Sequence, residues 1–210
     1  MGYETRKDLY NQISEKRNRP LISYVTSFRQ NASASIASDV IAQFIKCVQN
    51  IPNGPEEVDL FIMSYGGDPT VAYRIVTILR ERFKKIGALI PYTAYSAATL
   101  IALGADEIVM HPFSNLGPVD PQLTHKKDNQ TQFSFGSEDL RNYIEFVKND
   151  VGLSDQEQMQ RSFEIICKEV GAIPIGIAKR SAQLALSMGE KLLSLHMSDN
   201  NKAKTIAETL

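Results

Sequence analysis

Four short apolar runs, separated by segments with helical spacing, most constrain the fold of this chain. They read "PLISYVTS", "VDLFIMS", "ALIPYTA" and "DEIVMH", and they begin at residues 20, 58, 88 and 106. Nearly continuous apolar strands are typical of a parallel sheet that is covered on both faces. Strands that alternate with helical patterns indicate βαβ units. We therefore expect an α/β fold with a largely parallel sheet.

The segments between these runs predict helices with recognisable ends. Residues 36–48 carry apolar side chains at helical spacing. In the next helix Asp68 is a candidate N-cap and Pro69 suits the first turn, while Gly87 is expected to end it. A short buried helix should follow Ser96 and stop at Gly104.

The second half of the sequence is predominantly helical in pattern. Helices are expected from Ser137 to about Asn149, from the capping box "SDQE" at residues 154–157 to near Gly171, from Pro174 to about Met197, and over "KAKTIAETL". Residues 112–136 are rich in proline, glycine and polar residues, and such long loops are usually functional or mobile. We expect a polar N-terminal segment at 1–19 and one domain at 20–210, with C-terminal helices at about 137–210.

Composition excludes several classes of function. A formal net charge of -1 argues against a broad basic surface for nucleic acid. No run reaches the roughly 18 to 20 apolar residues that cross a bilayer, and the N-terminus has no apolar signal core. We therefore expect a cytoplasmic protein with no membrane or nucleic-acid partner. Cys47 and Cys167 lie in helical patterns and are expected to be buried thiols.

No cofactor is expected from the motifs of this chain. The three histidines, His111, His125 and His196, lack the spacing of a metal site. The sequence also has no glycine loop of the G-x-x-x-x-G-K-S kind that binds phosphate.

Two features that suit acyl transfer stand at the expected carboxyl ends of neighbouring strands, where sites gather in open α/β sheets. Gly66 and Gly67 can turn sharply and point N–H groups toward an oxyanion. Ser96 stands at a helix N-terminus, where the dipole favours negative charge, and the N–H of Ala97 is a further candidate donor. A Gly-Gly pair is also an ordinary turn and a serine is an ordinary N-cap, so spacing alone leaves both interpretations open.

Three longer segments resemble the serine dehydrogenase proteinase family, a relative of the ClpP peptidases, the signal peptide peptidase A group and the NfeD-type serine proteases. They are "VDLFIMSYGGDPTVAYRIVTILRERF", "YTAYSAATLIALGADEIVMHPFSNLGPVDPQ" and "IAKRSAQLALSMGEKLLSLHM". The resemblance extends over roughly residues 20–197. It implies a ClpP/crotonase-like spiral of ββα units with a helical C-terminal region that serves in oligomerisation.

The resemblance also implies roles for individual residues. Ser96 matches the nucleophile, Gly66 and Gly67 match the oxyanion glycines, and Ala97 matches the neighbouring donor. The family is described as using Ser, Asp and His, and Asp120 and His125 follow Ser96 in that order. ClpP-like relatives place a histidine near residues 119–120, where this chain has none.

Other groups compete with His125 for the role of general base. His125 is also readable as an exposed loop histidine beside Lys126 and Lys127, which are expected to be solvated. His111 follows a strand end and is a weaker candidate. His196 is expected to pack or to lie at an interface.

The primary hypothesis is therefore a cytoplasmic, homo-oligomeric serine peptidase that acts on peptides or unfolded proteins without metal or organic cofactor. Whether an ATPase or another partner delivers substrate is left open. A second hypothesis is a non-catalytic oligomeric scaffold or peptide-binding subunit, motivated by the missing ClpP-like histidine. Acyl-CoA chemistry of the crotonase type ranks third, because no constellation for an adenine nucleotide is evident.

Overall fold

The computed structural model describes residues 2–126 and 132–209, and this part of the chain forms two compact units. The sheet unit comprises residues 1–119 and 187–210, and the helical unit comprises residues 120–186. Helix α7 (Ala172–Ser194) begins in the helical unit and ends in the sheet unit. The two units share the continuous helix α7, and this division does not decide whether they form one domain. The expected single domain over residues 20–210 therefore stays a prediction.

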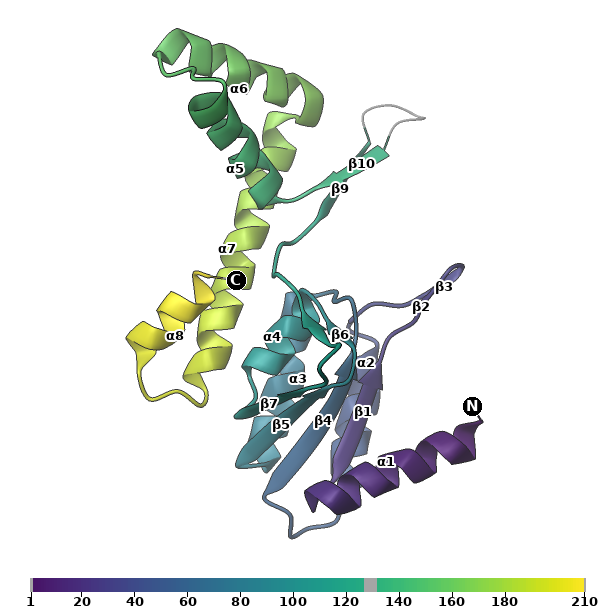
Figure 1. Cartoon of the computed structure of the whole chain (residues 1–210). Helices are drawn as coiled ribbons and strands as arrows, with labels where there is room; N and C mark the ends of the chain where they lie inside the picture. The colour runs from purple at the N-terminus through teal and green to yellow at the C-terminus, as the bar shows by residue number, and fades with distance from the viewer. Residues whose placement is uncertain (1, 127–131, 210) are drawn as a thin grey trace. The chain divides into compact units, whose positions relative to one another are not determined.

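The sheet unit is built on four parallel strands in the order β1, β4, β5 and β7 (Figure 1). Their bounds are Leu21–Val25 for β1, Glu57–Met63 for β4, Lys85–Ile90 for β5 and Glu107–Met110 for β7. One row of the register crosses the whole sheet through Leu21, Asp59, Gly87 and Glu107. The parallel α/β fold expected from the apolar runs is confirmed.

One face of this sheet packs against helices and forms the main core. The helices that connect the strands are α2 (Val40–Gln49), α3 (Pro69–Arg82) and α4 (Ala97–Leu103). Alternate residues of β4, namely Val58, Leu60 and Ile62, are fully buried in the same cluster as the apolar stripe of α3. The end of α7 and helix α8 (Asn200–Ala207) add Leu192 and Ala203 to this cluster.

Short strands extend the long ones before the chain enters a helix. The strands β6 (Thr93–Ala94) and β8 (Asn115–Leu116) pair in parallel, and Ser64 bridges to Ala94. The strands β2 (Phe28–Arg29) and β3 (Ala32–Ser33) form a small antiparallel hairpin after β1. Since β5 and β6 both precede α4, this part of the chain has the order of a ββα unit.

The helical unit begins with a second hairpin. In it β9 (Leu123–Lys126) and β10 (Gln132–Phe135) pair antiparallel. Helix α5 (Ser137–Glu145) continues into a π-helical turn at Phe146–Asp150, and α6 (Gln156–Val170) follows. Phe135, Val170 and Ala178 form a small core of this unit.

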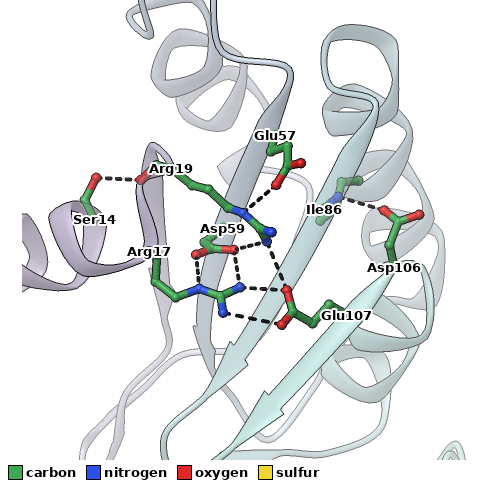
Figure 2. Close-up of polar contacts among 8 residues, drawn as sticks. All are labelled: Ser14, Arg17, Arg19, Glu57, Asp59, Ile86, Asp106 and Glu107. Atoms are coloured by element: carbon green, nitrogen blue, oxygen red, sulfur yellow. Dashed lines mark hydrogen bonds and ion pairs between the residues drawn. The ribbon is translucent and has the colours of Figure 1, made fainter.

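Helix α1 (Tyr3–Arg17) contains no buried residue, and it contacts the sheet through the Tyr10 ring, which meets that of Phe61 edge to face at 5.3 Å, and through polar contacts at its C-terminal end. Arg17 donates from Nε to Asp59 at 2.8 Å and from Nη2 to Glu107 at 2.7 Å (Figure 2). Arg19 approaches both carboxylates as well and pairs with Glu57 at 2.6 Å. Asp59 is almost completely buried, with 1% of its side chain exposed, so it depends on these guanidinium groups for compensation.

Several expected helix ends are confirmed. Asp68 caps α3 by accepting a hydrogen bond from the N–H of Thr70 at 2.8 Å, with Pro69 in the first turn. Gly104 follows the last residue of α4, and Gly171 follows the last residue of α6.

Other local expectations are wrong. Gly87 does not end α3, because Phe83 already leaves the helix and Gly87 lies in β5. A Cβ at Gly87 would stand 2.2 Å from Oδ1 of Asp59 and 3.3 Å from Nη2 of Arg17, so this glycine makes room for the charged cluster.

The capping residue and the cysteines also differ from expectation. Asp155, rather than Ser154, caps α6 by accepting hydrogen bonds from the N–H groups of Glu157 and Gln158. Cys47 is exposed and Cys167 is only half-buried, because each lies away from the apolar stripe of its helix.

Among the described residues, none of the helices has the length and apolar character needed to span a membrane.

Candidate active site

Ser96 occupies a strained turn between β6 and α4. Its φ of 53° and ψ of -119° are rarely adopted by a residue other than glycine. Such backbone strain costs about 1 to 3 kcal/mol and is concentrated at functional sites. A sharp strand-to-helix turn with a serine at its tip is also how the nucleophile elbow of α/β-hydrolases exposes its hydroxyl.

The Ser96 hydroxyl is not used as a helix cap. Ser96 stands at the N-cap position of α4, but its side chain makes no capping hydrogen bond. Within the described part of the chain the hydroxyl has no other partner, and the residue is half-buried rather than enclosed. Of the two interpretations that the sequence left open for this serine, the ordinary cap is therefore excluded.

Backbone contacts fix the position of the turn. The N–H of Ser96 donates to the carbonyl of Pro118 at 3.1 Å, and the N–H of Tyr95 donates to the carbonyl of Ser64 at 3.0 Å. The buried hydroxyl of Thr99 lies 3.0 Å from the carbonyl oxygen of Ala94 and 2.8 Å from that of Gly117. Thr99 therefore joins the strand before Ser96 to the loop that passes over it.

Gly66 and Gly67 are both needed as glycines for reasons of space and conformation. Gly66 has a φ of 104°, and a Cβ there would stand 2.7 Å from the Cβ of Ser96 and 3.1 Å from the N of Ala97. Gly67 has a φ of 151°, and its Cβ would stand 2.2 Å from the carbonyl oxygen of Ile36. The structure thus brings Gly66, Ser96 and Ala97 into contact.

Two of the three candidate oxyanion donors are available. The N–H of Gly66 already donates to the buried hydroxyl of Ser64 at 3.1 Å. The N–H groups of Gly67 and Ala97 have no acceptor among the residues that the structure describes. Gly67 is exposed, and Ala97 is the first residue of α4, where the helix leaves its N–H groups free and the dipole is positive.

A pair of buried hydroxyls that the sequence pattern did not single out lies beside this turn. Thr26 and Ser64 stand just after β1 and at the end of β4, and Oγ1 of Thr26 lies 2.9 Å from Oγ of Ser64. Both residues are buried. The signal was present in the sequence, because each is a hydroxyl residue that closes an apolar strand run.

In the sheet unit, no described basic side chain makes a hydrogen bond with the Ser96 hydroxyl. His111 is exposed, and its Nδ1 accepts from the N–H of Phe113 at 3.2 Å. His196 lies 2.9 Å from the carbonyl oxygen of Leu103, at the opposite end of α4 from Ser96. Neither of these histidines is positioned as a base.

Asp120 and His125 belong to the helical unit, so their pairing with Ser96 stays a prediction. His125 lies in β9, and its ring meets that of Phe133 in β10 at 5.5 Å between centroids. Among described residues these two candidates share no hydrogen bond. Lys126 is exposed, and Lys127 lies outside the described residues.

The surroundings of Asp120 make its charged state less favourable than that of an ordinary aspartate. Its Oδ2 accepts from Gln122 at 2.7 Å, while its buried Oδ1 has no partner in the described structure. Burial, followed by the nearby charges of Asp139 and Glu138, raises the pKa of Asp120 above its ordinary value. In a catalytic triad the aspartate stays ionised while it orients the histidine, and the raised pKa of Asp120 works against that state.

No group of three histidine, cysteine, aspartate or glutamate side chains within residues 2–126 and 132–209 is placed to hold a metal ion. The arrangement that the structure does present is an uncapped serine whose Cβ lies against Gly66, with free backbone N–H groups on Gly67 and Ala97, the residues that follow Gly66 and Ser96. This arrangement suits attack on a carbonyl carbon and stabilisation of the resulting oxyanion.

Comparison with known proteins identifies the family of this chain. A family model described as ClpP-like SDH-type serine proteinase matches residues 3–131, more than half of the 210 residues. The matched range begins before the resemblance over residues 20–197 and ends before the C-terminal helices. It contains all the candidate site residues, namely Gly66, Gly67, Ser96, Ala97, Asp120 and His125.

Two archaeal proteins of Methanocaldococcus jannaschii are similar in sequence. The uncharacterized protein MJ0137 is 32% identical over 126 residues, which is 56% of this chain and 43% of the relative. The uncharacterized protein MJ1495 is 42% identical over 71 residues, which is 33% of this chain and 24% of the relative. The chain therefore matches less than half the length of either relative.

Proposed function

Because this chain belongs to the family of ClpP-like SDH-type serine proteinases, we propose that it hydrolyses peptide bonds with Ser96 as the nucleophile. The observation that carries the proposal is the strained turn, in which the hydroxyl of Ser96 is uncapped and the Cβ of Ser96 lies against Gly66. Ordinary helix caps have no need of this strain.

In the proposed reaction the Ser96 oxygen attacks the carbonyl carbon of the scissile bond while a base takes the hydroxyl proton. The N–H groups of Gly67 and Ala97 donate to the oxyanion, an interaction of about 3 to 4 kcal/mol for each well-placed donor. The base returns the proton to the departing amine, and an acyl-enzyme forms on Ser96. Water then attacks the ester and regenerates the hydroxyl.

His125 is the proposed base, supplied by the helical unit. Its imidazole is the type of group that accepts a proton near neutral pH. Asp120 was expected to orient it, but burial raises the pKa of Asp120 and so opposes its charged form, and the two residues are best tested separately. Peptides or unfolded proteins are the proposed substrates of a cytoplasmic homo-oligomer, with delivery by an ATPase or other partner left open.

The direct test is labelling by a fluorophosphonate probe together with hydrolysis of unfolded protein. Wild-type protein should be labelled on Ser96, and Ser96→Ala should abolish both labelling and hydrolysis. Ser114→Ala is the matched control, because that serine lies in the same unit and donates to the carbonyl of His111. Hydrolysis that persists in Ser96→Ala would exclude this mechanism.

A non-catalytic, peptide-binding role is the second candidate function. It is favoured by one observation, that no basic side chain of the described sheet unit is bonded to Ser96. Under this alternative Ser96 would resist the probe in folded, assembled protein, while His125→Gln would change nothing. Under the peptidase proposal His125→Gln should slow labelling strongly.

A further inference from the structure

Three aromatic rings from separate segments stack next to the Ser96 turn. Phe28 in β2 and Tyr65 lie 3.9 Å apart between ring centroids, with an angle of 31° between the planes. Tyr65 and Tyr95 lie 5.7 Å apart and are nearly parallel at 16°. All three belong to the sheet unit, so their mutual placement is given by one compact body.

The chain itself ties this stack to the reacting centre. Tyr65 immediately precedes Gly66, and Tyr95 immediately precedes Ser96. Gly66 and Ser96 are in contact, since a Cβ on Gly66 would stand 2.7 Å from the Cβ of Ser96. The stacked rings of Tyr65 and Tyr95 therefore lie next to the contact between Gly66 and Ser96.

The rings are held in place but remain accessible. A Cβ at Gly117 would stand 2.1 Å from Cδ1 of Tyr95, so the loop after β8 lies directly on that ring. Tyr65 is contacted by rings on two sides, yet 55% of its surface stays exposed. Phe28 and Tyr95 are half-buried, so the group is anchored on both sides of an exposed ring. Packed aromatic rings that keep an exposed face beside the proposed nucleophile have the composition of a binding site.

We propose that Phe28, Tyr65 and Tyr95 form a specificity subsite that binds an aromatic or large apolar side chain of the peptide, close to the scissile bond. The inference rests on the proposed function and narrows its substrate class. Aromatic side chains gain both apolar contact and favourable ring geometry against such a wall. The three side chains carry no charge at neutral pH, so a charged residue at this place in the substrate would lose hydration without a partner.

Equilibrium binding to the Ser96→Ala protein tests the subsite without requiring catalysis. The probes are dye-labelled decapeptides of one sequence with phenylalanine, alanine or glutamate at every second position, followed by fluorescence anisotropy. The phenylalanine peptide should bind most tightly and the glutamate peptide most weakly. Tyr65→Ala should weaken binding of the phenylalanine peptide about three- to tenfold, which is the range of one aromatic contact. Binding of the alanine peptide should stay unchanged.

Matched variants separate specificity from folding. Tyr65→Phe should keep the preference, because the ring is retained. Tyr92→Ala removes another exposed tyrosine of the same unit, 54% exposed and outside the stack, and should have no effect. Phe28→Leu keeps apolar bulk without a ring and should reduce the preference for the phenylalanine peptide. This variant provides the test if Tyr65→Ala fails to fold.

The outcomes also separate this inference from the proposed function. Equal binding of the three peptides, or equal losses for all of them in Tyr65→Ala, would overturn the subsite. A retained phenylalanine preference in a protein whose Ser96 resists the fluorophosphonate would support the subsite and reject the peptidase. Labelling of Ser96 together with equal binding of the three peptides would support the peptidase and reject the subsite.

Discussion

At the scale of single residues, Gly66 leaves no room for a side chain beside Ser96. In Gly66→Ala the new methyl group would meet the Ser96 Cβ and the Tyr95 carbonyl oxygen, both at 2.7 Å, in a backbone with a φ of 104°. We expect fluorophosphonate labelling to fall at least tenfold and stability to fall by about 1 to 3 kcal/mol. Gly152→Ala is the control, since Gly152 has a φ of 81° but open space around it. Strain alone would then lower stability without changing the labelling rate, and similar labelling losses in both variants would contradict the steric explanation.

Asp120 is the second residue whose substitution distinguishes two interpretations. A carboxyl whose pKa is raised in the folded state stabilises the fold below its ordinary pKa and loses that contribution as pH rises through the folded value. Asp120→Asn should therefore raise the melting temperature at pH 7 and change it little at pH 3, as measured by circular dichroism. If Asp120 instead orients a catalytic imidazole, labelling of Ser96 at pH 7 should fall sharply in the same variant.

At the scale of elements, the attachment of α1 depends on a glycine in a neighbouring strand. Gly87→Ala would place a methyl group 2.2 Å from Oδ1 of Asp59 and displace the carboxylate that Arg17 binds. We expect a loss of about 1 to 3 kcal/mol and faster hydrogen exchange in α1. Gly176→Ala is the matched control, because Gly176 lies inside α7 with no atom near its Cβ position. It should stabilise its helix by about 0.5 to 1 kcal/mol and leave exchange in α1 unchanged.

The elements that sequence could predict are those whose signals are local. The strand that ends at Met63, the cap at Asp68 and the stop at Gly104 each follow from a few adjacent residues. Gly87 was misassigned because its role depends on Asp59 and Arg17, which lie 28 and 70 positions earlier in the chain. A pattern search within one segment has no access to that contact. The strain at Ser96 and the use of the Gly66 N–H by Ser64 are likewise products of packing between segments.

At the scale of the whole molecule, the two units should respond to acid in different ways. Hydrogen bonding from Arg17 lowers the pKa of Glu107 to about 2, against an ordinary value of 4.5. A carboxyl whose pKa is lower in the folded than in the unfolded protein stabilises the fold at every pH above its unfolded pKa, and this contribution is lost as the pH falls toward its folded pKa. The sheet unit should therefore lose stability between about pH 4.5 and about pH 2. The raised pKa of Asp120 acts in the opposite direction in the helical unit.

Hydrogen exchange across a pH series, corrected for the intrinsic rate, would resolve this difference. Protection of α1 and β7 should decline first on acidification, while α5 and α6 keep theirs. Glu107→Gln removes the titrating group and should give lower protection of α1 at pH 7 with a flatter dependence on pH. Parallel loss of protection in both units, or an unchanged pH profile in Glu107→Gln, would show that the guanidinium cluster does not control the acid response. Acid should loosen α1 through this cluster and leave the contact between the Tyr10 and Phe61 rings in place, because neither ring titrates in this pH range.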